Sequence, residues 1–436
     1  DFLSRYATSC ALLDERSYWQ QIVSTRVRSL RNMAHQRAKE QTVDETGQGE
    51  ANFCLNRELT AQLLNQSNRA YRTDINELLL TGVLLGIHRW GGETTVRLDM
   101  EGHGREQLSD TLDLSQTVGW FTSLYPLVLA IGTDSSIGSA INSVKKDYRA
   151  VPNNGIGFGV LKYLAQESAV KGSVNSEMVF NYLGQIDHLR SERQLFDLAS
   201  EPTGESSSRK GMHALSLSGI VAQGQLSFSL QFDQSRYPGA QMQGLMAAIE
   251  GALIDIAEHC VNTERGAYVP TDFPLANVTE AELASWGQGR EVQELFPATG
   301  MQQGLLFHSL LQSGSYVTQT ELTFKGLNVG LFKQAWQEVV DRHGIFRTTF
   351  VGLESGNWHQ LVLPKARLHW QELDLSALDQ DEQRIKVGAI REEDKREDFS
   401  LNEAPLMRMS LLALGDDRAI FIWSHHHALL DGLSIP

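Results

Sequence analysis

The feature of this sequence that most constrains its fold is the alternation of two apolar periodicities along the chain. Residues 226–232 carry apolar side chains at every second position, which is typical of a half-buried strand. The apolar residues that follow recur at helical spacing, at Leu245, Ile249, Leu253 and Ile256. The same patterns predict helices over 78–90 and 331–343 and a strand over 419–423. Because strands and helices are interleaved, the sequence predicts a mixed α/β (α+β) fold.

A change of composition divides the chain. Between residues 261 and 294 the sequence carries two prolines among scattered acidic residues, and a strongly apolar pattern restarts at Leu295. Such a stretch is typical of a connection between domains. We therefore predict a first domain over residues 1–262, a linker over 263–293 and a second domain over 294–436.

Charge and cysteine content exclude several function classes. The formal net charge is −15 at pH 7, which disfavours a broad nucleic-acid-binding surface, because duplex binding needs many cations that neutralise phosphates. Cys10, Cys54 and Cys260 are widely spaced and form no CxxC pair, so we expect neither a disulfide framework nor a metal site. The sequence shows no apolar run of 18 residues and no secretion signal, so we expect no membrane span and a cytoplasmic location.

The densest chemistry in the sequence lies near the C-terminus. Residues 419–434 read AIFIWSHHHALLDGLS, so a predicted buried strand leads into three histidines and then Asp-Gly. Histidine is the usual side chain for moving a proton near pH 7, and an acid nearby can orient it. His426 and His427 can face the same cavity only if the strand has ended, because consecutive strand residues point to opposite sides. Buried structural histidines and a zinc site are the alternatives, and adjacent histidines rarely converge on one metal.

A second candidate lies where another predicted strand ends. Residues 95–106 read TVRLDMEGHGRE, in which apolar and charged residues alternate up to Glu101 and a Gly-His-Gly turn follows. Glu101 therefore stands where an apolar strand gives way to a turn, a position that can present a carboxylate to a cavity. An ordinary exit from a strand into a turn is the alternative.

The histidine stretch resembles a known family motif. Residues 426–432, HHALLDG, match the HHxxxDG motif of the condensation-domain superfamily of nonribosomal peptide synthetases. Three upstream stretches resemble other motifs of that family in the expected order, namely residues 296–306 (FPATGMQQGLL), 342–350 (RHGIFRTTF) and 399–408. The resemblance implies a chloramphenicol-acetyltransferase-like fold, with two-layer lobes.

The same resemblance implies roles for single residues. His427, the second histidine of the motif, would be catalytic, either as a general base for the attacking amine or as a stabiliser of the tetrahedral intermediate. His426 would support the site, and Gly432 would let the backbone approach the substrate closely. Asp431 would be structural and would pair with an arginine, for which Arg347 and Arg408 are the candidates.

The first half of the chain resembles epimerization domains, which are relatives of condensation domains. Residues 101–106 match the EGHGRE motif of that group, and four further stretches agree with it, at residues 71–80, 117–126, 152–159 and 180–185. Such domains invert the α-carbon of a carrier-bound thioester. The resemblance implies that Glu101 carries one of the two protons exchanged. Asn181 and Tyr182 would line the site, with a packing role for Tyr182 as an alternative, and His103 would be either a reactant or a loop-stabilising residue.

The two resemblances together imply an enzyme whose domains are cut at both ends. No HHxxxDG stretch stands before residue 101, and the chain stops four residues after its own motif, so we expect a fragment of a synthetase. An epimerization domain followed by a condensation domain implies a D-configured donor. The partners would be peptidyl carrier domains bearing phosphopantetheine arms, with no metal and no directly bound cofactor. The alternatives are a catalytically incomplete, carrier-binding scaffold and a stand-alone CoA-type acyltransferase.

Overall fold

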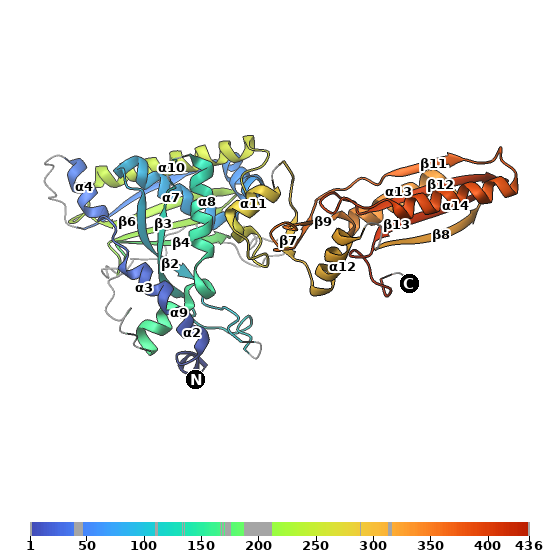
Figure 1. Cartoon of the computed structure of the whole chain (residues 1–436). Coiled ribbons are helices and arrows are strands. Elements are labelled where there is room, and N and C mark those ends of the chain that lie inside the picture. Colours follow the sequence, from blue (N-terminus) through green and yellow to red (C-terminus); the bar gives the residue numbers. More distant parts are fainter. Residues whose placement is uncertain are drawn as a thin grey trace. The chain divides into compact units, whose positions relative to one another are not determined.

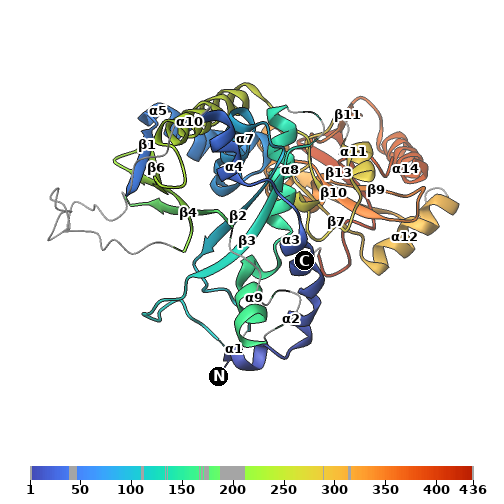
Figure 2. The same cartoon turned by 90° about the vertical axis from the view of Figure 1, so that its left-hand side faces the viewer.

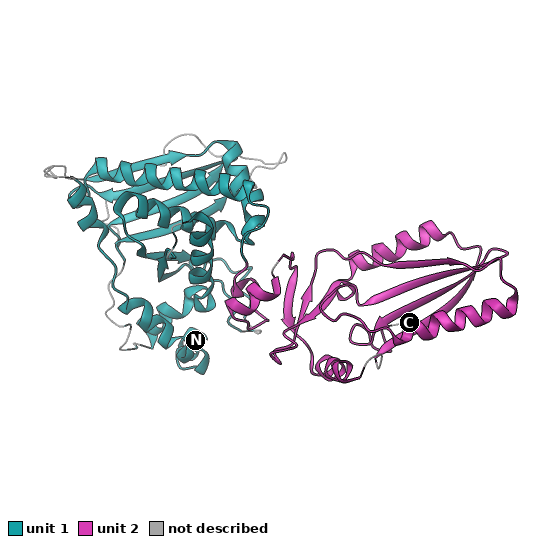
Figure 3. Cartoon of the chain, turned by 45° about the horizontal axis from the view of Figure 1, so that its top comes forward, with its two compact units in different colours: residues 1–267 teal, residues 268–436 magenta. Residues whose placement is uncertain are grey.

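The computed structural model describes residues 2–38, 47–109, 112–132, 134, 136–165, 167, 170, 176–186, 212–287, 289–312 and 316–434. The chain divides into two compact units, residues 1–267 and residues 268–436 (Figure 3). The division falls inside the stretch predicted as a linker. The part of that stretch after residue 267 belongs to the second unit, because Phe273, Val278 and Leu283 form an apolar cluster with Val351 and Leu361.

The first unit is built on a six-stranded sheet with the order β1-β6-β5-β4-β2-β3. Its strands are β1 (Gln48–Cys54), β2 (Thr95–Gly102), β3 (Ser123–Ala130), β4 (Met178–Gln185), β5 (Leu215–Ala222) and β6 (Gln225–Asp233). The predicted strand at 226–232 is β6, and the predicted strand that leads to Glu101 is β2. The neighbours β2, β4 and β5 run parallel, so the carboxyl ends of these three strands meet at one edge of the sheet.

Three long helices lie against this sheet: α7 (Ile75–Gly91), α8 (Ile137–Arg149) and α10 (Gly239–Asn262). Figure 1 and Figure 2 show α7 and α10 side by side over the strands. The helices predicted at 78–90 and around Leu245–Ile256 are α7 and α10. Gly86 allows their close contact, because a Cβ at that position would lie 2.7 Å from the Cα of Ile249.

Shorter helices complete the first unit. They are α1 (Phe2–Tyr6), α2 (Cys10–Asp14), α3 (Arg16–Ser24), α4 (Leu30–Ala38), α5 (Arg57–Ala61), α6 (Ser67–Tyr71) and α9 (Ile156–Gly159). Within the described part of the chain, no helix has both the length and the apolar character needed to cross a membrane.

The second unit contains two smaller sheets, with the orders β7-β10-β9 and β11-β12-β13-β8. The strands are β7 (Glu294–Pro297), β8 (Val317–Lys325), β9 (Thr348–Val351), β10 (His359–Val362), β11 (Trp370–Asp374), β12 (Met407–Gly415) and β13 (Arg418–His426). The helices are α11 (Glu280–Gly287), α12 (Gly300–Leu311), α13 (Val329–Arg342) and α14 (Gln380–Arg396). The predicted strand at 419–423 lies within β13, and the predicted helix at 331–343 is α13.

The four-stranded sheet is covered on both faces. Phe332 and Trp336 of α13 pack on Phe421 and Trp423 of β13, with ring centroids 5.0 Å apart in the Phe332–Phe421 and Trp336–Trp423 pairs. On the other face, a separate cluster joins residues of α14 to Ile422 and its neighbours. Because consecutive residues of β13 alternate between these two layers, the strand reads as a continuous apolar run. The mixed α/β class predicted from the sequence is confirmed in both units.

Candidate active site

Glu101 lies at the carboxyl end of β2, next to the parallel strand β4. The Nδ2 atom of Asn181 on β4 donates a hydrogen bond of 2.6 Å to the Oε2 atom of Glu101. The two residues follow directly on the last ladder pair between the strands, Met100 with Phe180. The structure thus places Asn181, a residue that the resemblance assigned to the lining of the site, beside Glu101. A carboxylate at this sheet edge, held by one amide, keeps acceptor capacity for a further proton or hydrogen bond.

Tyr182 does not share that position. It lies on the opposite face of β4, where its ring packs against the apolar core of the first unit. Burial in this setting raises the pKa of its hydroxyl. The packing role that the sequence left open for Tyr182 is therefore the one that the fold gives it.

The turn after Glu101 is held by its own side chains. His103 is exposed, and its Nδ1 accepts a hydrogen bond of 3.0 Å from the backbone N–H of Arg105, while its Nε2 lies 3.2 Å from Glu106. Glu106 in turn accepts a hydrogen bond of 2.7 Å from Asn154. Both ring nitrogens of His103 are thus engaged within the turn, which matches the loop-stabilising alternative. The contact between Glu106 and Asn154 joins two motifs whose proximity in space the sequence could not show.

The three histidines of the second unit occupy different environments, because β13 ends between them. His425 is fully buried beside Trp423, with ring centroids 4.5 Å apart, and burial lowers its pKa to about 4. Neither of its ring nitrogens has a hydrogen-bond partner among the described residues. His426 is the last residue of the strand, and His427 follows it with a partly exposed side chain.

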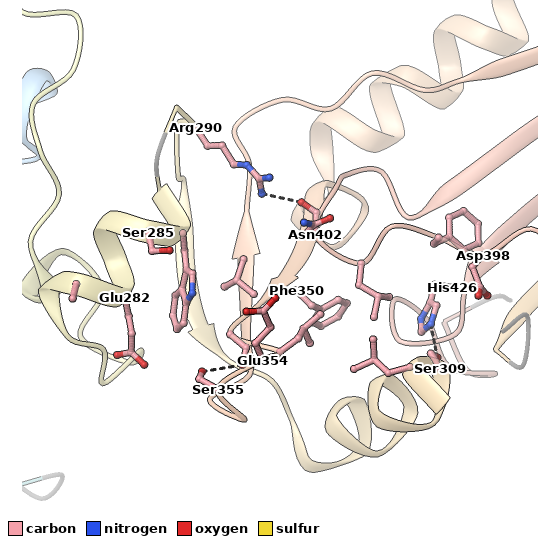
Figure 4. Close-up of a pocket in the computed structure, with 18 residues that line it drawn as sticks. Glu282, Ser285, Arg290, Ser309, Phe350, Glu354, Ser355, Asp398, Asn402 and His426 are labelled. Carbon is pink, nitrogen blue, oxygen red and sulfur yellow. Dashed lines mark hydrogen bonds between the residues drawn. The ribbon is translucent and has the colours of Figure 1, made fainter. Parts of the chain in front are cut away.

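His426 is held as a neutral ring. Its Nδ1 accepts from the backbone N–H of Ala428 at 3.1 Å, so the proton of the neutral ring is on Nε2, which lies 2.9 Å from the hydroxyl of Ser309. Burial lowers the pKa of His426 to about 4. His426 and Ser309 form part of the wall of a cavity of about 1140 Å³ within the second unit (Figure 4). Ser309 could not be identified from the sequence, since it lies on α12, 117 positions upstream of His426.

His427 has the arrangement of a proton acceptor. Its Nδ1 lies 2.9 Å from the carbonyl oxygen of Leu430, and its backbone N–H donates to the carbonyl of Tyr316 at 2.8 Å. A carbonyl only accepts, so Nδ1 carries the proton of the neutral ring and Nε2 carries the lone pair. Among the described residues, no hydrogen bond occupies that Nε2 atom.

The predicted ion pair of Asp431 is not formed within the described residues. Asp431 is exposed, and it accepts hydrogen bonds from the backbone N–H of Leu433 and from Ser434, which lower its pKa. Arg347 is buried and donates instead to the carbonyls of Val340 and Leu363 and to Gln293. Its Nε and Nη1 atoms are thus engaged by acceptors inside the unit, so Arg347 does not pair with the exposed Asp431.

Arg408, the other candidate partner, also has different contacts. It donates to Asp394 at 2.8 Å and to the carbonyls at the end of α14, and it lies over the ring of Phe399. This arginine therefore caps the last turn of α14. A side chain at Gly432 would meet no described atom within 4 Å, so the backbone there borders open space.

Comparison with protein families places both units in one group. The family model described as "Condensation domain" matches residues 1–274 and 292–436. The chain belongs to the condensation-domain family. Among curated relatives of these condensation-type units, a linear gramicidin synthase polypeptide of Brevibacillus parabrevis is 36% identical over 444 residues, which cover 100% of this chain and 6% of that protein. Bacitracin synthase 3 of Bacillus licheniformis is 32% identical over 443 residues, which cover 99% of this chain and 7% of that protein.

A solved structure agrees with this assignment. The epimerization domain from the third module of tyrocidine synthetase B is similar, with a TM-score of 0.52 and 28% identity over 60% of this chain and 59% of that domain. The chain therefore consists of condensation-type units of the nonribosomal peptide synthetase class, with the chloramphenicol-acetyltransferase-like fold expected from the sequence. It spans less than a tenth of the length of the two curated relatives.

Proposed function

We propose that the two units act in successive steps of nonribosomal peptide synthesis in the cytoplasm. The first unit takes part in L-to-D epimerization of a carrier-bound aminoacyl or peptidyl thioester. The second takes part in condensation of that D-configured donor with the next aminoacyl thioester. The observation that carries the proposal is the pair of proton-handling groups at strand ends, Glu101 held by Asn181 and His427 with its Nε2 lone pair available. Similarity to a solved epimerization domain, at 28% identity and a TM-score of 0.52, supports the first step.

In the epimerization step, Glu101 exchanges a proton with the α-carbon. The C–H bond breaks, its proton passes to one face of the site, and the electron pair is delocalised into the thioester carbonyl. A proton then returns to the opposite face, so the step needs two proton-carrying groups. Glu101 supplies one of them. The other is expected to be a histidine of an HHxxxDG motif, which does not stand before residue 101 in this sequence.

In the condensation step, His427 handles the proton of the attacking amine. The amine nitrogen forms a bond to the donor carbonyl carbon, and the Nε2 atom of His427 accepts the proton that the nitrogen loses. The tetrahedral intermediate then collapses, the C–S bond breaks, and the sulfur of the phosphopantetheine arm leaves as a thiol after taking the proton back from His427. Carrier domains deliver both substrates on such arms, so the chain's own residues bind, orient and move protons.

The test uses a synthetase that carries this chain and loaded carrier domains. Glu101→Gln should abolish loss of α-deuterium from the carrier-bound residue while leaving condensation of a supplied D-configured donor. His427→Ala should do the reverse, with exposed His369→Ala as the matched control that changes neither reaction. If neither substitution affects either reaction, the chain acts as a catalytically incomplete, carrier-binding scaffold and the proposal is wrong. If His427→Ala leaves peptide-bond formation intact, the role of His427 is contradicted.

A further inference from the structure

The polar face of β2 carries three charged residues, at alternate positions. Arg97 donates to the carbonyls of Val23 and Thr25, at 3.3 and 3.4 Å. Glu101, at the end of the strand, accepts from Asn181. Asp99 lies between them and is only 4% exposed. Because a charge is costly to bury without partners, Asp99 needs a structural explanation that the proposed chemistry does not supply.

Three hydrogen bonds converge on the Asp99 carboxylate. The hydroxyl of Ser176 donates to Oδ1 at 2.6 Å, and its backbone N–H donates to Oδ2 at 3.2 Å. The Nε2 atom of His213 lies 2.7 Å from Oδ2, and since a carboxylate only accepts, it is the imidazole that donates. Ser176 stands just before β4 and His213 just before β5. One side chain on β2 therefore binds residues that precede β4, its parallel neighbour, and β5, the next strand beyond β4.

The backbone alone joins β2 to β4 weakly. The two strands share just two ladder pairs, Asp99 with Val179 and Met100 with Phe180, whereas β2 shares eight with β3. Side-chain contacts extend this short junction in both directions. Asp99 holds one end through Ser176, and Glu101 holds the other through Asn181.

We propose that Asp99, Ser176 and His213 form a positioning clamp that fixes Glu101 relative to Asn181. The inference rests on the proposed epimerization function, because the clamp is inferred to position the Glu101 carboxylate for that reaction. Asp99 and Glu101 are two residues apart on one strand face, so their Cα atoms are about 7 Å apart and move together. A carboxylate that exchanges a proton with carbon must be held to within a fraction of an ångström, and displacement by about 1 Å can cost about 100-fold in rate.

The test compares isosteric and supporting variants in the synthetase that carries this chain. Asp99→Asn removes the negative charge, so the hydrogen bonds from Ser176 and His213 lose their charge assistance and the clamp weakens. We expect kcat for α-deuterium loss to fall about 10- to 100-fold, with KM changed less than about twofold because Asp99 does not touch substrate. His213→Leu should act in the same way. His213→Gln keeps an N–H donor near the Nε2 position and should restore most of the rate.

A control separates positioning from general stability. Glu77 is only 1% exposed and accepts a hydrogen bond of 2.6 Å from Arg149. Both residues are remote in sequence from the turn that follows Glu101. Glu77→Gln should lower the melting temperature without lowering kcat in the folded fraction. The proposal is overturned if Asp99→Asn loses no more kcat than Glu77→Gln at equal thermal stability, or if its loss appears in KM alone.

A second readout keeps the clamp distinct from the proposed function. A wild-type synthetase whose α-deuterium loss does not depend on Glu101 would contradict the epimerization assignment itself. In that case hydrogen exchange still tests the clamp, because Asp99→Asn should speed exchange over 180–185 at the carboxyl end of β4 more than Glu77→Gln does. Equal exchange in the two variants would show that the three residues do not hold this junction.

Discussion

Asn181 donates a hydrogen bond of 2.6 Å to Glu101 across the carboxyl ends of two parallel strands. This bond joins two motifs that lie 80 residues apart in the sequence. It fixes the direction of the carboxylate at the sheet edge where substrate chemistry is proposed.

Asn181→Leu removes that donor at nearly constant volume. We expect loss of α-deuterium to slow about 10-fold or more, because a charge-assisted hydrogen bond worth about 1.5–3 kcal/mol is lost. The measurement is the washout rate from a carrier-bound aminoacyl thioester. Ser229→Ala on the same sheet removes an exposed hydrogen bond to Glu50 and is the matched control. Equal rates in the two variants would contradict a role for Asn181 at this carboxylate.

The sequence predicted the elements of the fold better than their contacts. Apolar periodicity located α7, α10, α13 and β6, and a continuous apolar run located β13, which is buried on both faces. The resemblance implied that Asn181 lines the site, and the structure places its amide within hydrogen-bond distance of Glu101. Contacts such as the bond between Ser309 and His426 were not predictable, because packing and not sequence spacing brings α12 to the end of β13.

The partners of buried and exposed polar side chains were also not predictable from the sequence. Asp431 was expected to pair with Arg347 or Arg408, but both arginines are engaged by carbonyls and other side chains. The clamp of Asp99, Ser176 and His213 was not predicted. Alternation placed Asp99 on the polar face of β2, yet nothing in the sequence showed which distant donors reach it.

Gly104 should be intolerant of a side chain. Its φ is +66°, and a Cβ there would lie 1.6 Å from the carbonyl oxygen of Phe121. Gly104→Ala should destabilise the first unit by about 1–3 kcal/mol or more, because both the conformation and the space exclude it. Thermal unfolding measures the change. Gly159→Ala is the control, since a Cβ at that position meets nothing within 4 Å.

The stability of the second unit should fall in mild acid. Burial lowers the pKa of His425 and His426 to about 4 in the folded state, below the ordinary value of 6.5. The unfolded chain therefore binds more protons below about pH 6.5, so stability is complete above that pH and decreases towards pH 4. The loss approaches about 3 kcal/mol for each histidine.

Urea unfolding at a series of pH values tests this behaviour, with hydrogen exchange identifying the transition of β12 and β13. His425→Phe should make the pH dependence shallower, because one buried titrating ring is removed. A pH dependence unaltered by this substitution would show that His425 does not contribute to it.

Arg347 and Asp431 should contribute unequally to stability. Arg347→Met leaves the carbonyls of Val340 and Leu363 without their donor and should cost about 2–4 kcal/mol. Asp431→Asn alters an exposed turn and should change stability by less than about 0.5 kcal/mol. Chemical unfolding of the two variants measures the difference. A large loss in Asp431→Asn would contradict the assignment of Asp431 to an exposed turn without an arginine partner.

Glu101 is the residue proposed to exchange the α-proton of a carrier-bound thioester. The most direct measurement is loss of α-deuterium from that thioester in a synthetase carrying this chain, compared between the wild-type enzyme and Glu101→Gln. We expect that the wild-type enzyme releases the label and that Glu101→Gln, which preserves the shape of the side chain, does not. Release of the label at the wild-type rate by folded Glu101→Gln would contradict this role.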